Sequence, residues 1–172
     1  KQSVESFIKE GKIIEIPGDL PGDFLKKRAG TFVTIEKNGE LRGCIGTYLS
    51  SRANIAEEII HNAIAAATED YRFGLITTEE LPFLSYTVYI LSYPEPVEDI
   101  KELNPKKFGI IVKSQGFSSG SDVIFNTAPE YYQKTGLLLP DLEGVDSAEK
   151  QISIACQKGG IEPQKEKVFI YK

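Results

Sequence analysis

The residues whose types and spacing could do chemistry stand together at residues 41–47, LRGCIGT. In an extended chain alternate side chains share a face, so Arg42, Cys44 and Gly46 are expected on one face. A neighbouring guanidinium stabilises a thiolate, and it can also bind a carboxylate or phosphate through two hydrogen bonds. Because glycine has no side chain, a ligand could approach the backbone at Gly46. The pattern indicates a site for a nucleophilic cysteine or for an anion.

A purely structural role is the alternative for the same stretch. A free cysteine is often a small buried hydrophobe, and glycines in a strand often mark a bulge or close packing. Catalytic thiols commonly have a histidine base, and the one histidine, His61, is expected at the surface or boundary of a helix. Cys156 lies in an apolar part of another predicted helix and is expected in the core. The choice between an enzyme and a binding module therefore stays open.

A second polar cluster consists of Asn62, Asp70 and Arg72. Asp70 and Arg72 stand two residues apart, where a long helix is expected to end. A carboxylate and a guanidinium at this position either hold a loop in place or face a cleft as part of a site.

The strongest local pattern is a hairpin. Residues 31–37 and 40–48 have the character of strands, and Asn38-Gly39 between them favours a type I′ turn. Simple alternation places Leu41, Gly43, Ile45 and Thr47 on the core face. After the hairpin, Asn54 is expected to cap a helix that runs to about Asp70, with apolar residues along one stripe.

The remaining pattern predicts short elements and no internal repeat. Helices are expected at residues 3–10, 128–134 and 146–158, with helical turns at 78–81 and after Asp99. Strands are expected at residues 85–91, 109–113, 122–125, 136–139 and 167–171. Because hairpins outnumber strand–helix–strand units, the predicted class is α+β, with a mainly antiparallel sheet and flanking helices.

Composition limits the possible functions. The 172 residues are 41% hydrophobic and 26% charged, which suits one folded domain over residues 1–172. The net charge of −5 disfavours nucleic acid as a partner: a duplex would need a local basic patch, and RNA binding also has little support from the charge. The clusters at residues 26–28 and 106–107 are expected to be solvated. With one histidine and two cysteines, no metal site or other cofactor is expected. No membrane span or signal peptide is found, so a cytoplasmic location is expected. The absence of methionine suggests a trimmed chain or part of a longer, fused protein.

The LRGCIGT stretch resembles the signature of the AMMECR-type domain family. Further stretches agree in order: residues 62–64 (NAI) with 70–73 (DYRF, where the family usually has DPRF), 94–97 (PEPV), 107–112 (KFGIIV) and 136–140 (GLLLP). Together these matches cover roughly residues 3–170.

The resemblance implies an α+β fold in two unequal lobes, with the signature in a cleft between them. It also implies partnership with a Memo-like protein and a radical-SAM protein, as for the A component of AmmeMemoRadiSam systems, and no established activity. The candidate site residues carried over are Arg42, Gly43, Cys44, Gly46, Asn62, Asp70 and Arg72. Residues 114–135 depart from the family pattern and are expected to be an insertion that covers the cleft or contacts a partner.

Overall fold

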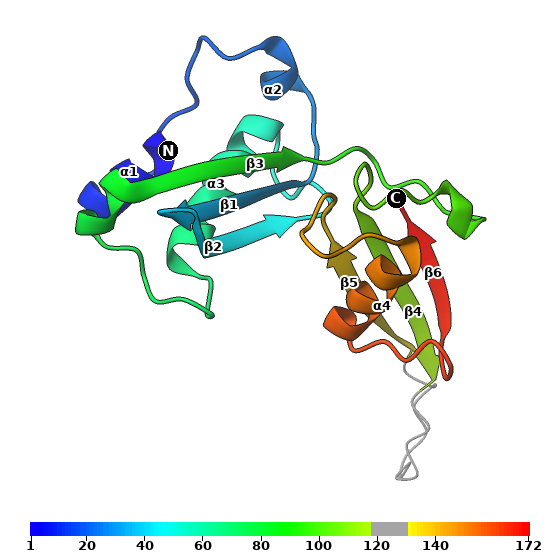
Figure 1. The fold of residues 1–172 in the computed structure, drawn as a ribbon. Helices are drawn as coiled ribbons and strands as arrows, with labels where there is room; N and C mark the ends of the chain where they lie inside the picture. The colour runs from blue at the N-terminus through cyan, green and yellow to red at the C-terminus, as the bar shows by residue number, and fades with distance from the viewer. Residues whose placement is uncertain (118–130) are drawn as a thin grey trace, which may run out of the picture. The chain divides into compact units, whose positions relative to one another are not determined.

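The computed structural model describes residues 1–117 and 131–172, which form two compact units, Lys1–Tyr93 and Pro94–Lys172 (Figure 1). Each unit combines helices with a three-stranded antiparallel sheet. The predicted α+β class is therefore confirmed.

In unit 1 the central strand β1 (Thr31–Lys37) lies between β2 (Glu40–Thr47) and β3 (Leu84–Ile90). The turn between β1 and β2 has positive φ at Asn38 (54°) and Gly39 (86°), as the Asn-Gly pair predicts. The strands predicted at 31–37 and 40–48 are thus confirmed almost residue for residue.

A bulge in β2 changes which side chains face the core. Ile35 pairs with Gly43, but Glu36 pairs with Leu41, so Arg42 is an extra residue in β2. The extra residue reverses the alternation before it, and Leu41 is 45% exposed. The prediction that Leu41 faces the core is wrong for this reason.

Helix α3 (Ile55–Thr68) begins at Asn54, whose Oδ1 accepts a hydrogen bond from Glu57 N at 2.9 Å, as predicted. It lies across one face of the unit 1 sheet (Figure 1). The small residues Ala63, Ala66 and Ala67 are buried against Val33 and Ile35 of β1, which lets the helix approach the sheet closely.

The other helices of unit 1 are α1 (Gln2–Glu10), which ends at left-handed Gly11 as predicted, and α2 (Gly22–Lys26). The 3-10 helix η1 (Thr78–Phe83), which covers the helical turn predicted at 78–81, is capped by Thr77.

Unit 2 has the strands β4 (Ile110–Phe117), β5 (Tyr131–Leu138) and β6 (Lys167–Tyr171), with β4 in the centre. The helix predicted at 128–134 is wrong over 131–134, because these residues pair with β4 as a strand. Residues 128–130 and the strand predicted at 122–125 lie outside the described residues. The predicted strand at 136–139 is the end of β5, and that at 109–113 is the first part of β4.

Helix α4 (Ala148–Gly159) lies across one face of the unit 2 sheet and buries Ala155 and Cys156 against it (Figure 1). Its cap is Ser147 rather than the predicted Asp146. The 3-10 turn η2 (Ile100–Glu102) follows Asp99, which caps it as predicted.

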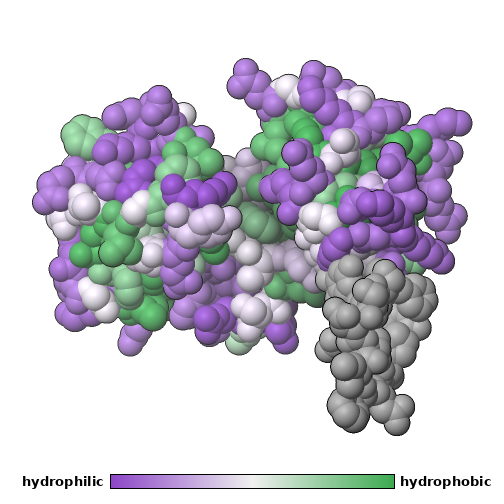
Figure 2. Space-filling view, turned by 90° about the horizontal axis from the view of Figure 1, so that it is seen from below, coloured by the Kyte–Doolittle hydropathy of each residue, from purple (hydrophilic) through white to green (hydrophobic). Residues whose placement is uncertain are grey.

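Hydrophobic residues also reach the surface, in patches between hydrophilic ones (Figure 2). Among them are Leu49, 47% exposed, and Leu75, 67% exposed. Among the described helices, none has the length and apolar character that crossing a bilayer requires.

Candidate functional site

Cys44 lies on the face of the unit 1 sheet opposite α3. It pairs with Thr34 of β1, and the Cys44 Sγ and Thr34 Oγ1 atoms are 3.3 Å apart. The residue is only partly buried, unlike Cys156, which is 3% exposed in the core of unit 2 as predicted. Cys44 is therefore not simply a core hydrophobe, and its thiol has a polar neighbour.

The backbone of Cys44 is held by Asp70 and Arg72, which follow α3. Cys44 N donates to Asp70 Oδ2 at 2.8 Å, and Arg72 Nη2 donates to Cys44 O at 3.4 Å. Since β2 is at an edge of the sheet, these two side chains occupy backbone groups that an edge strand would otherwise leave open. Asp70 and Arg72 of the second predicted cluster thus meet Cys44 of the first.

Asp70 and Arg72 also form a two-bond ion pair. Arg72 Nε donates to Asp70 Oδ1 at 2.9 Å and Nη2 donates to Oδ2 at 2.7 Å. The hydrogen bonds from Arg72 lower the pKa of Asp70 to about 2; burial opposes this shift, and the bond from Cys44 N adds to it. The pKa of Arg72 is raised, first by the Asp70 hydrogen bond and also by the charge of an ionised Cys44. The buried Asp70 carboxylate and the Arg72 guanidinium therefore form a charged pair beside Cys44.

The two members of the pair differ in exposure. The Asp70 side chain is 3% exposed, whereas that of Arg72 is 46% exposed. The Asp70 and Cys44 bonds use Nε and Nη2 of Arg72, and among the described residues none accepts a hydrogen bond from Nη1. The Nη1 group of this fixed, half-exposed guanidinium is therefore available, while Nη2 is already bonded to both Asp70 and Cys44 O.

Arg42, expected to act beside the thiol, has a different set of partners. Its Nε and Nη2 donate to the two Glu80 oxygens, each at 3.0 Å, and its guanidinium also donates to the carbonyls of Gly74 and Leu75. These bonds, with one from Lys37, lower the pKa of Glu80 to about 2, against the effect of burial. Arg42 thus holds the 74–80 segment against β2. The guanidinium bonded to Cys44 is that of Arg72.

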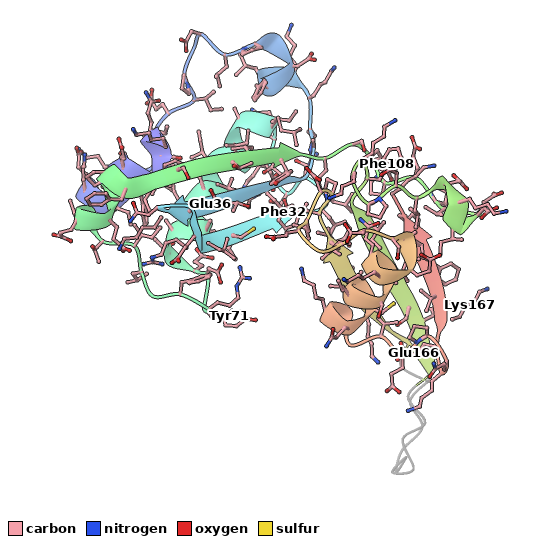
Figure 3. The ribbon with its side chains drawn as sticks, viewed as in Figure 1. Phe32, Glu36, Tyr71, Phe108, Glu166 and Lys167 are labelled. Atoms are coloured by element: carbon pink, nitrogen blue, oxygen red, sulfur yellow. The ribbon has the colours of Figure 1, made fainter. Side chains whose placement is uncertain are left out.

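Both glycines of the stretch have packing reasons. A Cβ on Gly43 would lie 2.2 Å from the carbonyl oxygen of Ala66 in α3. A Cβ on Gly46 would lie 2.4 Å from the ring of Phe32, its partner on β1, which is labelled in Figure 3. Gly43 allows the helix to approach, and the Phe32 ring covers Gly46.

Asn62 belongs to a separate polar network on the α3 side of the sheet. Its Nδ2 donates to Thr31 O and Thr31 Oγ1 at 3.0 and 2.9 Å. Thr47 Oγ1 donates at 2.6 Å to Glu58, which is 1% exposed. Burial alone would raise the pKa of Glu58, but hydrogen bonds from Thr47, Ser51 and Arg52 lower it. The structure therefore does not bring Asn62 together with Cys44.

Sequence reasoning missed Thr34, Glu58 and Glu80. The first was hidden by the bulge, because a regular hairpin would pair Thr34 with Gly43. Glu58 had a signal, since it stands three residues after Ile55 on the apolar stripe of α3. His61 lies partly exposed on α3, as expected. Among the described residues, no group of three or more potential ligands is arranged to hold a metal.

Comparison with known proteins gives one consistent family. A model of the AMMECR1 family matches residues 1–172. A protein of Thermotoga maritima is 46% identical over 98% of this chain and 88% of its own length. A protein of Clostridium acetobutylicum is 38% identical over 94% of this chain, which spans only 31% of that longer protein. The crystal structure of an uncharacterised protein from Pyrococcus horikoshii superposes with a TM-score of 0.74 at 28% identity, over 99% of this chain and 83% of the other.

Proposed function

The chain belongs to the AMMECR1 family, and we propose that unit 1 carries a site in which Cys44 and Arg72 bind a small anionic molecule. The observation that carries the proposal is the half-exposed Arg72 guanidinium, fixed by Asp70 and Cys44 O with its Nη1 group open beside a partly buried thiol. We expect the site to work in a reducing, cytoplasmic setting, because both described cysteines are free.

Asp70 restricts the conformations of the Arg72 side chain, and this supports the proposal. A guanidinium held by two hydrogen bonds on one side presents the other side in a fixed direction, which suits a carboxylate or phosphate. Since Asp70 also accepts Cys44 N, one buried carboxylate sets the positions of both Arg72 and the strand that carries the thiol. The reacting atom available to a bound electrophile is then the Cys44 sulfur.

Two alkylating reagents of equal size test the proposal. Iodoacetate carries a carboxylate and iodoacetamide does not. If Arg72 binds an anion beside Cys44, the ratio of the iodoacetate to the iodoacetamide rate at Cys44 exceeds the ratio for glutathione. Rates are read by mass spectrometry of the peptide that contains Cys44.

Two substitutions make this test specific. Arg72→Gln is expected to lower the ratio to that of glutathione, while Arg72→Lys retains part of the effect. Arg42→Gln is the control. Because Arg42 is bonded to Glu80, this substitution is expected to leave the ratio unchanged. A ratio equal to that of glutathione in the unaltered protein, or one that survives Arg72→Gln, overturns the proposal.

A second candidate is an accessory module that works with a Memo-like protein and a radical-SAM protein. It is favoured by the loop after α3, where Tyr71 is 95% exposed and Leu75 is 67% exposed; Tyr71 projects away from the sheet (Figure 3). Exposed Tyr side chains next to Arg are common in protein interfaces. The Clostridium acetobutylicum relative, in which this domain is part of a longer chain, is consistent with such a role.

Substitutions can distinguish this second candidate function from the first. Tyr71→Ser with Leu75→Ser is expected to abolish binding to the two partners from the same genome, measured by calorimetry, while Cys44→Ala retains it. Partner binding unaffected by the double substitution contradicts the accessory role.

A further inference from the structure

The face of the unit 2 sheet opposite α4, called here the open face, carries lysines and aromatic rings, although Ile111 on it is only 7% exposed. Val112 and Ile170 belong to the core under α4, so they mark the α4 side of the sheet. Because side chains alternate along a strand, the neighbours of these two residues on β4 and β6 point to the other side. The described side chains that register places on the open face include no acidic residue: Ile111, Lys113, Gln115, Thr135, Leu137, Lys167, Phe169 and Tyr171. In a chain with net charge −5, this is a local departure from the average.

Lysines and aromatic rings alternate on this face. Lys167 Nζ lies 5.0 Å from the centroid of the Phe169 ring, and Lys113 Nζ lies 5.6 Å from the centroid of the Tyr171 ring. Lys113 stands directly opposite Phe169, so both ammonium groups lie along the row of rings. Phe169 is nevertheless 37% exposed, and Lys167 projects from the sheet (Figure 3).

We propose that this face binds single-stranded nucleic acid, with Phe169 and Tyr171 stacking on successive bases and Lys113 and Lys167 contacting phosphates. The two rings are two residues apart on β6, which separates them by about 7 Å along the strand. Exposed rings on adjacent sheet positions are how RNA-recognition sheets stack two or three bases. Stacking tolerates any base, so no sequence preference is expected from these contacts.

Charge and shape favour this occupant over two others. Duplex nucleic acid has its bases already stacked and paired, so the rings would gain no partner. An acidic peptide would satisfy the lysines but not the rings. The whole-chain charge argues against a duplex partner, and it does not exclude a single strand that follows one basic row.

Fluorescence anisotropy of a labelled oligo-thymidylate with the full chain tests the proposal. Two phosphate contacts predict binding that weakens about sevenfold when salt rises from about 50 to about 200 mM, since the single-strand salt slope is about −0.7 per contact. Lys113→Gln with Lys167→Gln is expected to remove most of this salt dependence. The charge-matched control is Lys150→Gln with Lys158→Gln on α4, which leaves it unchanged.

The aromatic contribution has its own variants. Phe169→Ala is expected to weaken binding about fivefold or more, as loss of one stacked base does. Phe169→Tyr retains a ring and is expected to retain binding, which separates stacking from a folding defect. The proposal is overturned if the oligonucleotide does not bind at low salt, or if the two lysine pairs matter equally. It is also overturned if duplex DNA or polyglutamate competes as well as the single strand.

Discussion

Units 1 and 2 share one chain path. In unit 1 the hairpin β1–β2 is followed by α3 and then by β3 on the other side of β1; in unit 2 the hairpin β4–β5 is followed by α4 and then by β6 on the other side of β4. Even the closest contact recurs: Gly43 meets the Ala66 carbonyl, and Gly136 meets the Ala155 carbonyl. The two units therefore pack a helix on a three-stranded antiparallel sheet in the same way.

The difference lies in what surrounds that contact. One residue after the glycine, unit 1 has the pair Thr34–Cys44, whereas unit 2 has the pair Ile111–Leu137. Four residues after the alanine, unit 1 has the buried Asp70, whereas unit 2 has Gly159. An aliphatic pair and a glycine are sufficient for this fold, so the thiol, the carboxylate and Arg72 are additions particular to unit 1.

The shared contact should show the largest effects. Gly43→Ala and Gly136→Ala each place a Cβ within 2.2 Å of a backbone carbonyl, at 2.2 and 1.8 Å respectively. We expect each to lower the free energy of unfolding by about 3 kcal/mol or more, measured by urea titration. Gly18→Ala, where no atom lies within 4 Å, is the control. Small losses at both positions would break the equivalence of the two units.

Arg42 is the extra residue of the bulge in β2. The described part of unit 2 lacks such a bulge, since β4 and β5 pair without a register shift. Arg42→Gln leaves Glu80, 13% exposed, without its main partner, and Lys37 and Thr77 N remain. We expect a loss of about 2–3 kcal/mol in the free energy of unfolding, somewhat below a fully buried pair. Arg28→Gln, at an exposed position, should change stability little. A stable Arg42→Gln protein with a lost alkylation preference would reverse the roles assigned to the two arginines.

Asp70 makes the stability of unit 1 depend on pH, whereas the equivalent residue of unit 2, Gly159, has no titratable side chain. Because its pKa is lowered from 3.8 to about 2, its stabilisation is fully present above about pH 4 and is lost as the pH falls toward 2. The shift corresponds to about 2 kcal/mol. Asp70→Asn should lose this amount at neutral pH and show a shallower decline in stability between pH 4 and 2. An unchanged acid profile would show that the Arg72 pair does not stabilise the fold.

The smallest effect on stability is expected at the Thr34–Cys44 pair, whose equivalent in unit 2 is the aliphatic pair Ile111–Leu137. Thr34→Val with Cys44→Val converts the unit 1 pair to the unit 2 type, and we expect a change of less than about 1 kcal/mol by urea unfolding. A large loss would mean that the pair is part of the structure of unit 1 rather than an addition to it.

Local patterns predicted much of the fold, because they depend on neighbouring residues. The Asn38-Gly39 turn and the Asn54 cap follow from backbone preferences alone. The shared topology was invisible, since equivalent positions have different residues, such as Cys44 and Leu137. The bulge was also hidden, and it misplaced Leu41 and concealed the contact of Thr34 with Cys44.

The structure brings three of the candidate residues together, but with other hydrogen-bond partners than the sequence favoured. Cys44, Asp70 and Arg72 meet, but a guanidinium on a side chain with three methylene groups can reach several partners, and sequence spacing favoured Arg42. Glu80, which binds Arg42, is 38 residues away in sequence. Only the folded chain determines which arginine accompanies the thiol.

We propose that the chemistry at Cys44 comes from its surroundings in unit 1 and not from its place in the fold. Leu137→Cys places a second thiol at the equivalent strand position of unit 2, and the two positions can be compared within one molecule by peptide mass spectrometry. We expect a raised ratio of iodoacetate to iodoacetamide labelling at Cys44 and a ratio like that of glutathione at position 137. Equal ratios at the two positions would contradict it.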